Sequence, residues 1–351
     1  MFGFEQIELM ARGGSLTLLV LWSWLLIRDH RDILAARMAV LTNLGIICYL
    51  LVTARWGIRF SPIGVFLAVG AGATPGLFWL FAKAWFNDEK RLNPVGVLLV
   101  LLSMANIIIM QLSYRGGGGI NLVAGAIFRL GMLAFAAAGL WEAWRGRGGD
   151  LVEGRRRLRP RIAAAVGCYV IIIAITEIAV FNTSAPRWII GLVGSSIVIV
   201  TLAFCAAMFA MRQGDLFGPQ KVGKSMPVKP ITDDPLAEKL SSHMTREMAW
   251  RENGLSIAAL AVQLGEQEYR LRRVINGQLG HRNFAAFLNG YRLVEVKAAL
   301  ADASQREVPI ITIALDAGFG SLGPFNRAFR EAEGMTPSEY RTRAMVDSGI
   351  G

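Results

Sequence analysis

The sequence predicts an all-α protein in two parts. A polytopic transmembrane bundle of about seven helices precedes a cytoplasmic all-α domain, which has two helix–turn–helix motifs joined by a long helix. Three observations support this prediction. Of the 351 residues, 54% are hydrophobic and only 18% are charged, whereas about a quarter of a typical soluble domain is charged. The long apolar stretches all precede residue 213. After that point the mean hydropathy falls sharply, and one helical sequence pattern occurs twice.

Seven segments of the first 212 residues approach or reach the roughly 20 apolar residues that cross a bilayer. The first segment must extend back past Arg12, whose long side chain can reach the interface. No A-x-A-like cleavage site follows this segment, so it is predicted to be a span and not a signal peptide. The predicted spans are Ile7–Ile27, Ala35–Ala54, Ser61–Phe81, Pro94–Leu112, Ile120–Trp141, Ile162–Phe181 and Trp188–Met211.

The loop charges predict the orientation of these spans. With seven spans and a cytoplasmic C-terminus, the inner loops hold thirteen Lys and Arg residues, and the outer segments hold five. This distribution obeys the positive-inside rule, which places the N-terminus outside and the C-terminus in the cytoplasm. The basic run Arg155–Arg161 is part of this excess of positive charge in the inner loops. It favours contact with anionic lipid over contact with nucleic acid.

Polar side chains inside spans are costly and are therefore candidates for sensing. An Arg129–Glu177 pair would line a ligand- or proton-responsive cavity, although a purely structural pair is the simpler interpretation. In the third span, the glycines of Gly70–Gly76, with Pro75, favour close helix packing over a hinge. The four sensing candidates are Asn43, Asn106, Arg129 and Glu177.

Charge and motif content argue against several classes of protein. The net charge is +11, but residues 1–212 contribute +10 and the remainder only +1. The three cysteines lie within apolar runs, which rules out a disulfide framework. The three histidines lie outside the predicted spans, which argues against bis-histidine haem and intramembrane zinc. The sequence lacks the H-E-x-x-H, P-loop and G-x-S-x-G motifs. We therefore predict no enzyme activity, no cofactor and no metal.

The sequence predicts four parts: a membrane domain over 1–212, a linker over 213–232, a helical domain over 233–345 and a tail over 346–351. The linker holds Gly, Pro and Lys without periodicity. In the helical domain, Ile257-x-x-Leu260-Ala261-x-x-x-Gly265 recurs as Ile310-x-x-Ile313-Ala314-x-x-x-Gly318. Each copy predicts a short helix, a tight turn in which Gly takes a positive φ, and a second helix. The segment Asn283–Asp302 predicts one helix that joins the two motifs. It would hold both recognition helices on one side, where they can enter major-groove turns roughly 34 Å apart.

Helical periodicity assigns the faces of the two recognition helices. Leu271, Val274 and Ile275 face the core in the first, and Phe325, Ala328 and Phe329 do so in the second. For a single helix, a merely solvated outer face is the preferred interpretation. Two copies in one register favour DNA contact, because Arg pairs with guanine edges and Asn with adenine edges. The outward residues are Tyr269, Arg272, Arg273 and Asn276, then Gly323, Asn326, Arg327 and Arg330.

A longer pattern carries a family resemblance. It runs Gly318-Phe319-x-Ser321-x-x-x-Phe325-x-Arg327-x-Phe329-Arg330-x-x-x-Gly334-x-Thr336-Pro337-x-x-Tyr340-Arg341. This pattern resembles the C-terminal signature of the AraC/XylS family of bacterial transcription regulators. The stretch from Leu271-x-Arg273 to Tyr291-Arg292-Leu293 also fits. The resemblance covers Pro235–Arg343, and it implies that one or both motifs insert into consecutive major grooves.

The resemblance also implies which residues contact DNA. The implied base-contacting residues are Tyr269, Arg272 and Arg273, then Leu322, Gly323, Pro324, Asn326 and Arg327, and we add Arg270, Asn276, Ser321 and Arg330 to the predicted DNA-binding set. Leu322-Gly323-Pro324 departs from the family in offering no side-chain donor, so the second helix contacts bases through Asn326 and Arg327 only, or mainly holds phosphates. Asn276-Gly277 departs as well. The membrane domain replaces the soluble N-terminal domain of many relatives, so their ligands do not transfer.

The predicted function is a membrane-integral one-component transcription regulator whose membrane domain senses a signal. Its predicted partners are promoter DNA, the lipid bilayer, a second copy in a homodimer and an unidentified signal ligand, with RNA polymerase as a further candidate. Two alternatives remain open. In the first, the protein is a transporter or membrane sensor whose helix–turn–helix tail serves regulation. In the second, it is a scaffold whose tail binds another protein.

Overall fold

The computed structural model describes residues 4–53, 61–89, 91–113, 119–145, 148–152, 156, 161, 165, 198–203, 206 and 235–347. Every named element in these ranges is a helix. One isolated antiparallel bridge joins Asp150 and Asn283. The prediction of an all-α protein is therefore confirmed.

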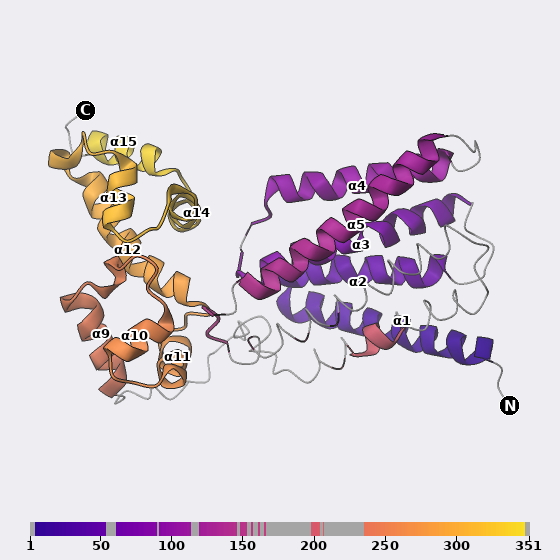
Figure 1. The fold of residues 1–351 in the computed structure, drawn as a ribbon, viewed down its shortest axis with the longest axis horizontal. Coiled ribbons are helices and arrows are strands. Elements are labelled where there is room, and N and C mark those ends of the chain that lie inside the picture. Colours follow the sequence, from indigo (N-terminus) through magenta and orange to yellow (C-terminus); the bar gives the residue numbers. More distant parts are fainter. Residues whose placement is uncertain are drawn as a thin grey trace. The chain divides into compact units, whose positions relative to one another are not determined.

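The described residues divide into two compact units. The N-terminal unit contains α1 to α5. The C-terminal unit contains α9 to α15 and, unexpectedly, the short segment Gly148–Val152 from the loop after α5. Figure 1 shows the two groups of helices.

The N-terminal unit contains five helices that are long and apolar enough to cross a membrane. These helices match the first five predicted spans. The sixth and seventh predicted spans lie for the most part outside the described residues, as do Glu177 and the predicted linker. The helices are α1 (Phe4–His30), α2 (Leu34–Val52), α3 (Pro62–Phe86), α4 (Pro94–Ser113) and α5 (Gly119–Arg145).

Helix α3 packs against α2, α4 and α5, and its glycines allow this close approach. A Cβ atom added at Gly70 would lie 2.7 Å from Sγ of Cys48 on α2. One added at Gly76 would lie 2.8 Å from Cγ2 of Val100 on α4. Because real Cβ atoms do not approach this closely, a larger residue at either position would force the neighbouring side chain to move. The predicted packing role of these glycines is confirmed.

The structure corrects the expectation for Arg12. Its side chain does not extend to an interface but is buried, with 6% of the residue exposed. The guanidinium donates hydrogen bonds to the Leu50 carbonyl oxygen (3.0 Å) and to Thr53 Oγ1 (2.9 Å) at the end of α2. The last carbonyl groups of a helix lack intrahelical donors. Arg12 supplies one and links α1 to α2.

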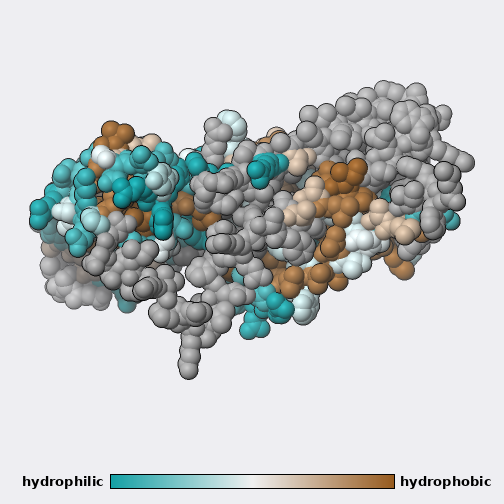
Figure 2. Space-filling view, turned by 90° about the horizontal axis from the view of Figure 1, so that it is seen from below, coloured by the Kyte–Doolittle hydropathy of each residue, from teal (hydrophilic) through white to brown (hydrophobic). Residues whose placement is uncertain are grey.

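The two units differ in their surfaces. Helices α4 and α5 expose many large apolar side chains, among them Leu102, Leu112, Leu122 and Leu130. Figure 2 shows apolar residues on the visible described surface of the N-terminal unit and mainly polar residues on that of the C-terminal unit. An apolar exterior on long helices is the arrangement that a lipid bilayer stabilises.

The C-terminal unit consists of two helix–turn–helix motifs around one long helix. The first motif comprises α10 and α11, and the second comprises α13 and α14. The elements are α9 (Pro235–Arg246), η3 (Ala249–Arg251), α10 (Ile257–Gln263), α11 (Glu268–Gly277), α12 (Phe284–Ala301), η4 (Ala303–Gln305), α13 (Ile310–Asp316), α14 (Leu322–Glu333) and α15 (Pro337–Asp347).

Side-chain caps begin several of these helices. Oγ of Ser256 accepts a hydrogen bond from the backbone N–H of Ala259 at the start of α10. Oδ1 of Asn283 accepts one from Ala286 at the start of α12. Thr336 and Glu339 form a reciprocal capping box at the start of α15. These bonds satisfy backbone donors that the helices leave without intrahelical partners.

Helix α12 contributes to two hydrophobic cores. Its first half packs Phe284, Phe287 and Leu288 into the core of the first motif. Its second half packs Val296 and Leu300 into the core of the second motif. The long connecting helix predicted from the sequence is therefore present, and it holds the two motifs together.

The turns contain the predicted glycines. Gly265 in the first motif has φ +63° and Gly318 in the second has φ +83°. At Gly318 the space is also restricted, because an added Cβ would lie 2.7 Å from the carbonyl oxygens of Trp250 and Arg251. Gly318 thus allows the second motif to pack directly against η3.

Arg292 of α12 contacts both helix–turn–helix motifs. Its buried guanidinium donates to the carbonyl oxygens of Trp250 (2.7 Å) and Glu252 (3.1 Å), and it lies 5.6 Å from the ring centroid of Phe319. Phe319 belongs to the core of the second motif, whereas Trp250 belongs to that of the first. Arg292 therefore bonds to one motif and stacks on the other.

Candidate nucleic-acid interface

The two recognition helices, α11 and α14, lie on the same side of the C-terminal unit. Figure 1 shows both nearly end-on along one edge of this unit, whereas α9 lies at the opposite edge. This is the arrangement that the long connecting helix predicted. It allows two helices to approach one face of a DNA duplex together.

The outer face of α11 presents three exposed side chains. Tyr269 is 64% exposed, and Arg270 and Arg273 are exposed as well. Arg270 forms an ion pair with Glu266 at 2.8 Å, one turn earlier. Asn276 is half-buried and donates a hydrogen bond to the His281 carbonyl oxygen at 3.0 Å. Tyr269 and Arg273 are thus the most accessible of the predicted base-contacting residues on this helix.

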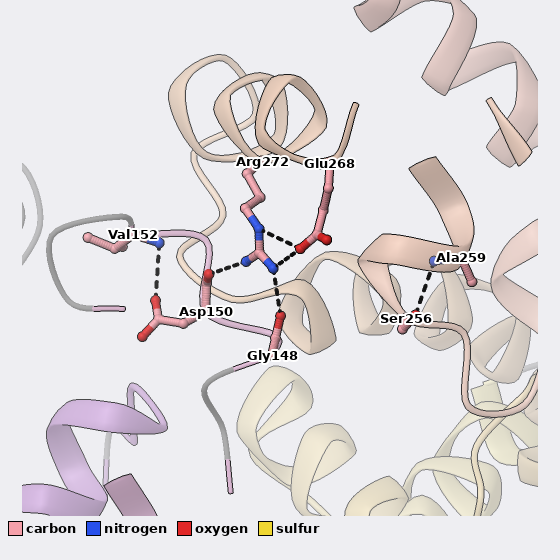
Figure 3. Close-up of polar contacts among 7 residues, drawn as sticks. All are labelled: Gly148, Asp150, Val152, Ser256, Ala259, Glu268 and Arg272. Atoms are coloured by element: carbon pink, nitrogen blue, oxygen red, sulfur yellow. Dashed lines mark hydrogen bonds and ion pairs between the residues drawn. The ribbon is translucent and has the colours of Figure 1, made fainter. Parts of the chain in front are cut away.

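Arg272 does not lie on an open face as the periodicity predicted. Only 7% of this residue is exposed, because the segment Gly148–Val152 covers it. Its guanidinium donates to the carbonyl oxygens of Asp150 (2.5 Å) and Gly148 (3.0 Å), and it also pairs with Glu268 one turn earlier on α11. Figure 3 shows Arg272 pointing from α11 towards this segment. The prediction that Arg272 faces solvent is wrong, because a distant segment supplies partners that local periodicity cannot reveal.

The outer face of α14 is open. Ser321, Leu322, Gly323 and Pro324 are exposed at its N-terminal end. Phe325 and Phe329 are fully buried on the opposite face, as periodicity predicted. In the next turns Arg327 and Arg330 are exposed and Asn326 is partly exposed. The first turn therefore presents apolar side chains and backbone, and the charged groups follow.

The sequence reasoning missed the segment Gly148–Val152. One signal was available: Leu151-Val152 is an apolar pair within a loop that is otherwise rich in Gly and Arg. Both side chains are buried, and Leu151 belongs to the core of the first motif. An apolar pair in a charged loop indicates a docked segment, although it does not name the surface to which the segment docks.

Two of the membrane sensing candidates join helices. Nδ2 of Asn43 on α2 donates to Oγ of Ser23 on α1 at 3.0 Å. Nδ2 of Asn106 on α4 donates to the Ala124 carbonyl oxygen of α5 at 2.9 Å. Interhelical bonds of this kind stabilise helix association inside a bilayer. Both residues thus have a structural role, whatever else they do.

The third candidate, Arg129, folds back along α5. A Cβ atom added at Gly125, one turn earlier, would lie 3.6 Å from a guanidinium nitrogen of Arg129. This distance is an ordinary van der Waals contact, so the arginine head group lies directly beside Gly125. The proposed partner of Arg129, Glu177, lies outside the described residues.

One titratable group near the first recognition helix has a shifted pKa. Burial lowers the pKa of His281 below its ordinary value, because a partly buried imidazole loses hydration of its charged form. Its ring packs edge-on against Phe287 with centroids 5.5 Å apart. In the part of the chain that the structure describes, no group of three or more His, Cys, Asp or Glu residues is placed to hold a metal ion.

Comparisons with known proteins agree with this architecture. Residues 260–343 match a family model described as a helix-turn-helix domain. The chain is 32% identical over 89 residues to the regulatory protein SoxS of Salmonella typhimurium and to that of Escherichia coli. The matched stretch is 25% of this chain and 79% of each relative. No solved structure matches the chain.

Proposed function

The chain belongs to the AraC/XylS family of bacterial transcription regulators, and on this premise we propose that it is a membrane-integral one-component regulator. The C-terminal unit binds promoter DNA in a sequence-specific manner. The N-terminal unit senses a signal at or across the inner membrane. The observation that carries this proposal is the presence of two recognition helices with exposed arginines on one side of a helical unit that follows a set of membrane-type helices.

The DNA contacts follow from the exposed side chains. Arg273 on α11 and Arg327 on α14 are exposed, and each can form a bidentate pair with a guanine. Tyr269 and Asn326 contact neighbouring bases. Arg330 and Arg270 are placed to hold phosphates, which position a protein without specifying sequence. The exposed Gly323 and Pro324 allow the backbone at the start of α14 to approach the groove closely.

The membrane topology follows from the loop charges. Seven spans place the N-terminus outside and the DNA-binding part in the cytoplasm. A signal acts only if it binds two states of the bundle with different affinities. Asn106, Arg129 and Glu177 are the residues through which such a difference would arise. Two copies in a homodimer would raise DNA affinity through effective concentration.

Selection from a randomised duplex library by the full-length protein in lipid nanodiscs tests the DNA-binding proposal. The pair Arg273→Ala/Arg327→Ala removes two charges from the recognition helices. As a matched control, Arg246→Ala removes an exposed charge from α9, at the opposite edge of the unit. We expect the selected duplex to lose more than about tenfold in affinity for the double variant and to bind the control almost normally.

The opposite result would contradict the proposal. If no duplex is enriched even at low salt, where electrostatic DNA binding is strongest, the C-terminal unit does not bind DNA. If both variants lose affinity equally, binding is electrostatic and not specific to the recognition helices.

A further inference from the structure

The segment Gly148–Val152, which we call the strap, is docked on the first recognition helix. It begins three positions after Arg145, the last residue of α5. Its Leu151 N–H donates to the Arg282 carbonyl oxygen (3.1 Å), and its Gly149 carbonyl oxygen accepts from the Phe284 N–H (2.8 Å). These two bonds flank the Asp150–Asn283 bridge. The strap is thus paired with the chain that leads into α12.

The strap is held by more than its backbone. Asp150, Leu151 and Val152 are all buried, and Leu151 belongs to the core of the first motif. Oδ1 of Asp150 also accepts a hydrogen bond from the Val152 N–H at 3.1 Å, which fixes the turn of the strap itself. The segment has five residues, of which three have buried side chains, and it forms two backbone hydrogen bonds with residues 282 and 284. It therefore makes a specific contact.

The strap engages a residue that the family resemblance predicts to contact DNA. Arg272 donates from Nε and Nη2 to Glu268, from Nη1 to the Asp150 carbonyl oxygen and from Nη2 to the Gly148 carbonyl oxygen. A guanidinium has five N–H groups, and four of them are used here. A bidentate contact with guanine needs two free N–H groups that point the same way. Arg272 therefore cannot form a bidentate contact with a guanine while the strap is docked.

We propose that the strap is an autoinhibitory contact: it holds Arg272 away from DNA, and its release allows the first motif to bind the promoter fully. This inference rests on the proposed DNA-binding function. The second motif has no corresponding cover among the described residues, since Arg327 is exposed. The docked protein thus presents one open recognition helix and one restricted helix.

The position of the strap in the chain assigns its control to the membrane part. The strap follows α5, the fifth candidate span, and precedes the sixth predicted span. A change at the cytoplasmic end of α5 would therefore act on the strap through the two residues that separate them. Affinity for DNA then scales with the fraction of protein whose strap is released. A signal in the membrane can regulate DNA binding in this way without a contact of its own on the DNA-binding part.

A reversible disulfide tests the proposal. The Asp150–Asn283 pair lies between its two flanking hydrogen bonds, which is the arrangement with the closest Cβ atoms in an antiparallel bridge. Asp150→Cys/Asn283→Cys should therefore form a disulfide on oxidation. The protein is full-length and in nanodiscs, with Cys48, Cys168 and Cys205 changed to alanine. The probe is the duplex recovered from the randomised library by the same protein in its reduced form.

We expect the oxidised protein to bind this duplex about tenfold or more weakly than the reduced protein, since one bidentate arginine contact is worth that much. The hydroxyl-radical footprint should shrink to one of two major-groove segments, and reduction should restore both. The single variants Asp150→Cys and Asn283→Cys should not respond to the oxidant. Because one sample is compared with itself, a folding defect cannot produce the reversible difference.

A release variant tests the opposite direction. Leu151→Ala weakens the buried anchor of the strap, so we expect tighter DNA binding. Equal affinities of the oxidised and reduced double-cysteine protein would overturn the proposal, and so would failure of the disulfide to form. Weaker binding by Leu151→Ala, with loss of amide protection in α11, would show that the strap is part of the DNA-competent fold. Absence of DNA binding in every form would overturn the proposed function itself, whereas intact binding without a redox effect would overturn only the role of the strap.

Discussion

The first helix–turn–helix motif is partly covered and the second is open, although the two are built on one plan. Both turns hold a glycine at positive φ, and both recognition helices bury an apolar face. They differ in what lies over the opposite face: the strap engages Arg272 in the first, whereas Arg327 is exposed in the second. The comparison shows that a repeated motif in one chain need not carry equal roles. Under the proposed function, one copy serves binding and the other serves regulation.

The two turns should respond very differently to the same substitution. Gly318→Ala forces a left-handed φ on alanine and brings its Cβ against the carbonyl oxygens of Trp250 and Arg251. We expect the local free energy of opening around α13 and α14 to fall by about 3 kcal/mol. Gly265→Ala meets open space, so it should cost only about 1 kcal/mol around α10. Hydrogen exchange of the full-length protein in nanodiscs measures both. Equal losses would show that the two turns are equivalent.

The loss of Arg292 should affect both motifs together. Arg292→Met keeps much of the side-chain volume but leaves the carbonyl oxygens of Trp250 and Glu252 without this buried donor. We expect a loss of about 2 kcal/mol in opening free energy, shared by the amides of α11 and α14. Arg251→Met removes the more exposed pair with Glu295 and serves as the control. If the loss in Arg292→Met is confined to one motif, Arg292 does not couple the two.

The contributions of the two recognition helices to DNA affinity should be unequal. With the strap docked, the second motif supplies most of the specific contacts. Arg327→Ala should therefore weaken binding of the selected duplex by about tenfold, or about 1.4 kcal/mol. Arg273→Ala should have a smaller effect. In the Leu151→Ala background the two losses should become similar, and electrophoretic mobility shifts in one buffer would measure them. A larger loss for Arg273→Ala in the parent protein would reverse the proposed roles.

The smallest expected difference is in the pH dependence. The pKa of His281 is lowered in the folded protein by burial, so the unfolded chain binds a proton more readily. Stability of the first motif is therefore highest above the unfolded pKa of about 6.5. It decreases as the pH falls from there towards the lower folded pKa. The second motif contains no histidine and should not change over this range.

Amide exchange in α11 and α14 between pH 7.5 and 5.5 checks this difference, after correction for intrinsic exchange rates. His281→Gln should flatten the response of α11. A parallel response in α14 would mean that the two motifs open as one cooperative unit. The two motifs would then not differ in the pH dependence of their stability.

The local pattern of the sequence was sufficient for most of the C-terminal architecture. The spacing of Leu271, Val274 and Ile275 identified the buried face of α11, and Gly265 and Gly318 identified both turns. The same periodicity placed Arg272 with Arg273 on an outer face, which was wrong for Arg272. Two of its partners, Gly148 and Asp150, lie more than 120 positions earlier in the chain. Helical periodicity describes the face of a helix but not what another segment brings to it.

The membrane part shows a similar limit. Apolar length identified the five described spans, and the small residues of α3 indicated its close contacts. The partner of Arg12 was not predictable, because an arginine near the end of a span can extend to the interface or can bond to a neighbouring helix end. The choice depends on Thr53 and the Leu50 carbonyl oxygen, which become neighbours only after α1 and α2 pack together.

The most direct test of the account is a genome-wide crosslinking footprint of the full-length protein in its native cell. It should be measured beside the Arg273→Ala/Arg327→Ala variant and the Arg246→Ala control. We expect a small number of sharp sites that persist in the control and disappear in the double variant, with all three proteins present in the inner membrane. Sites that survive in the double variant would contradict recognition through α11 and α14. If neither the unaltered protein nor the strap-release variant Leu151→Ala yields any sites, the protein is not a DNA-binding regulator.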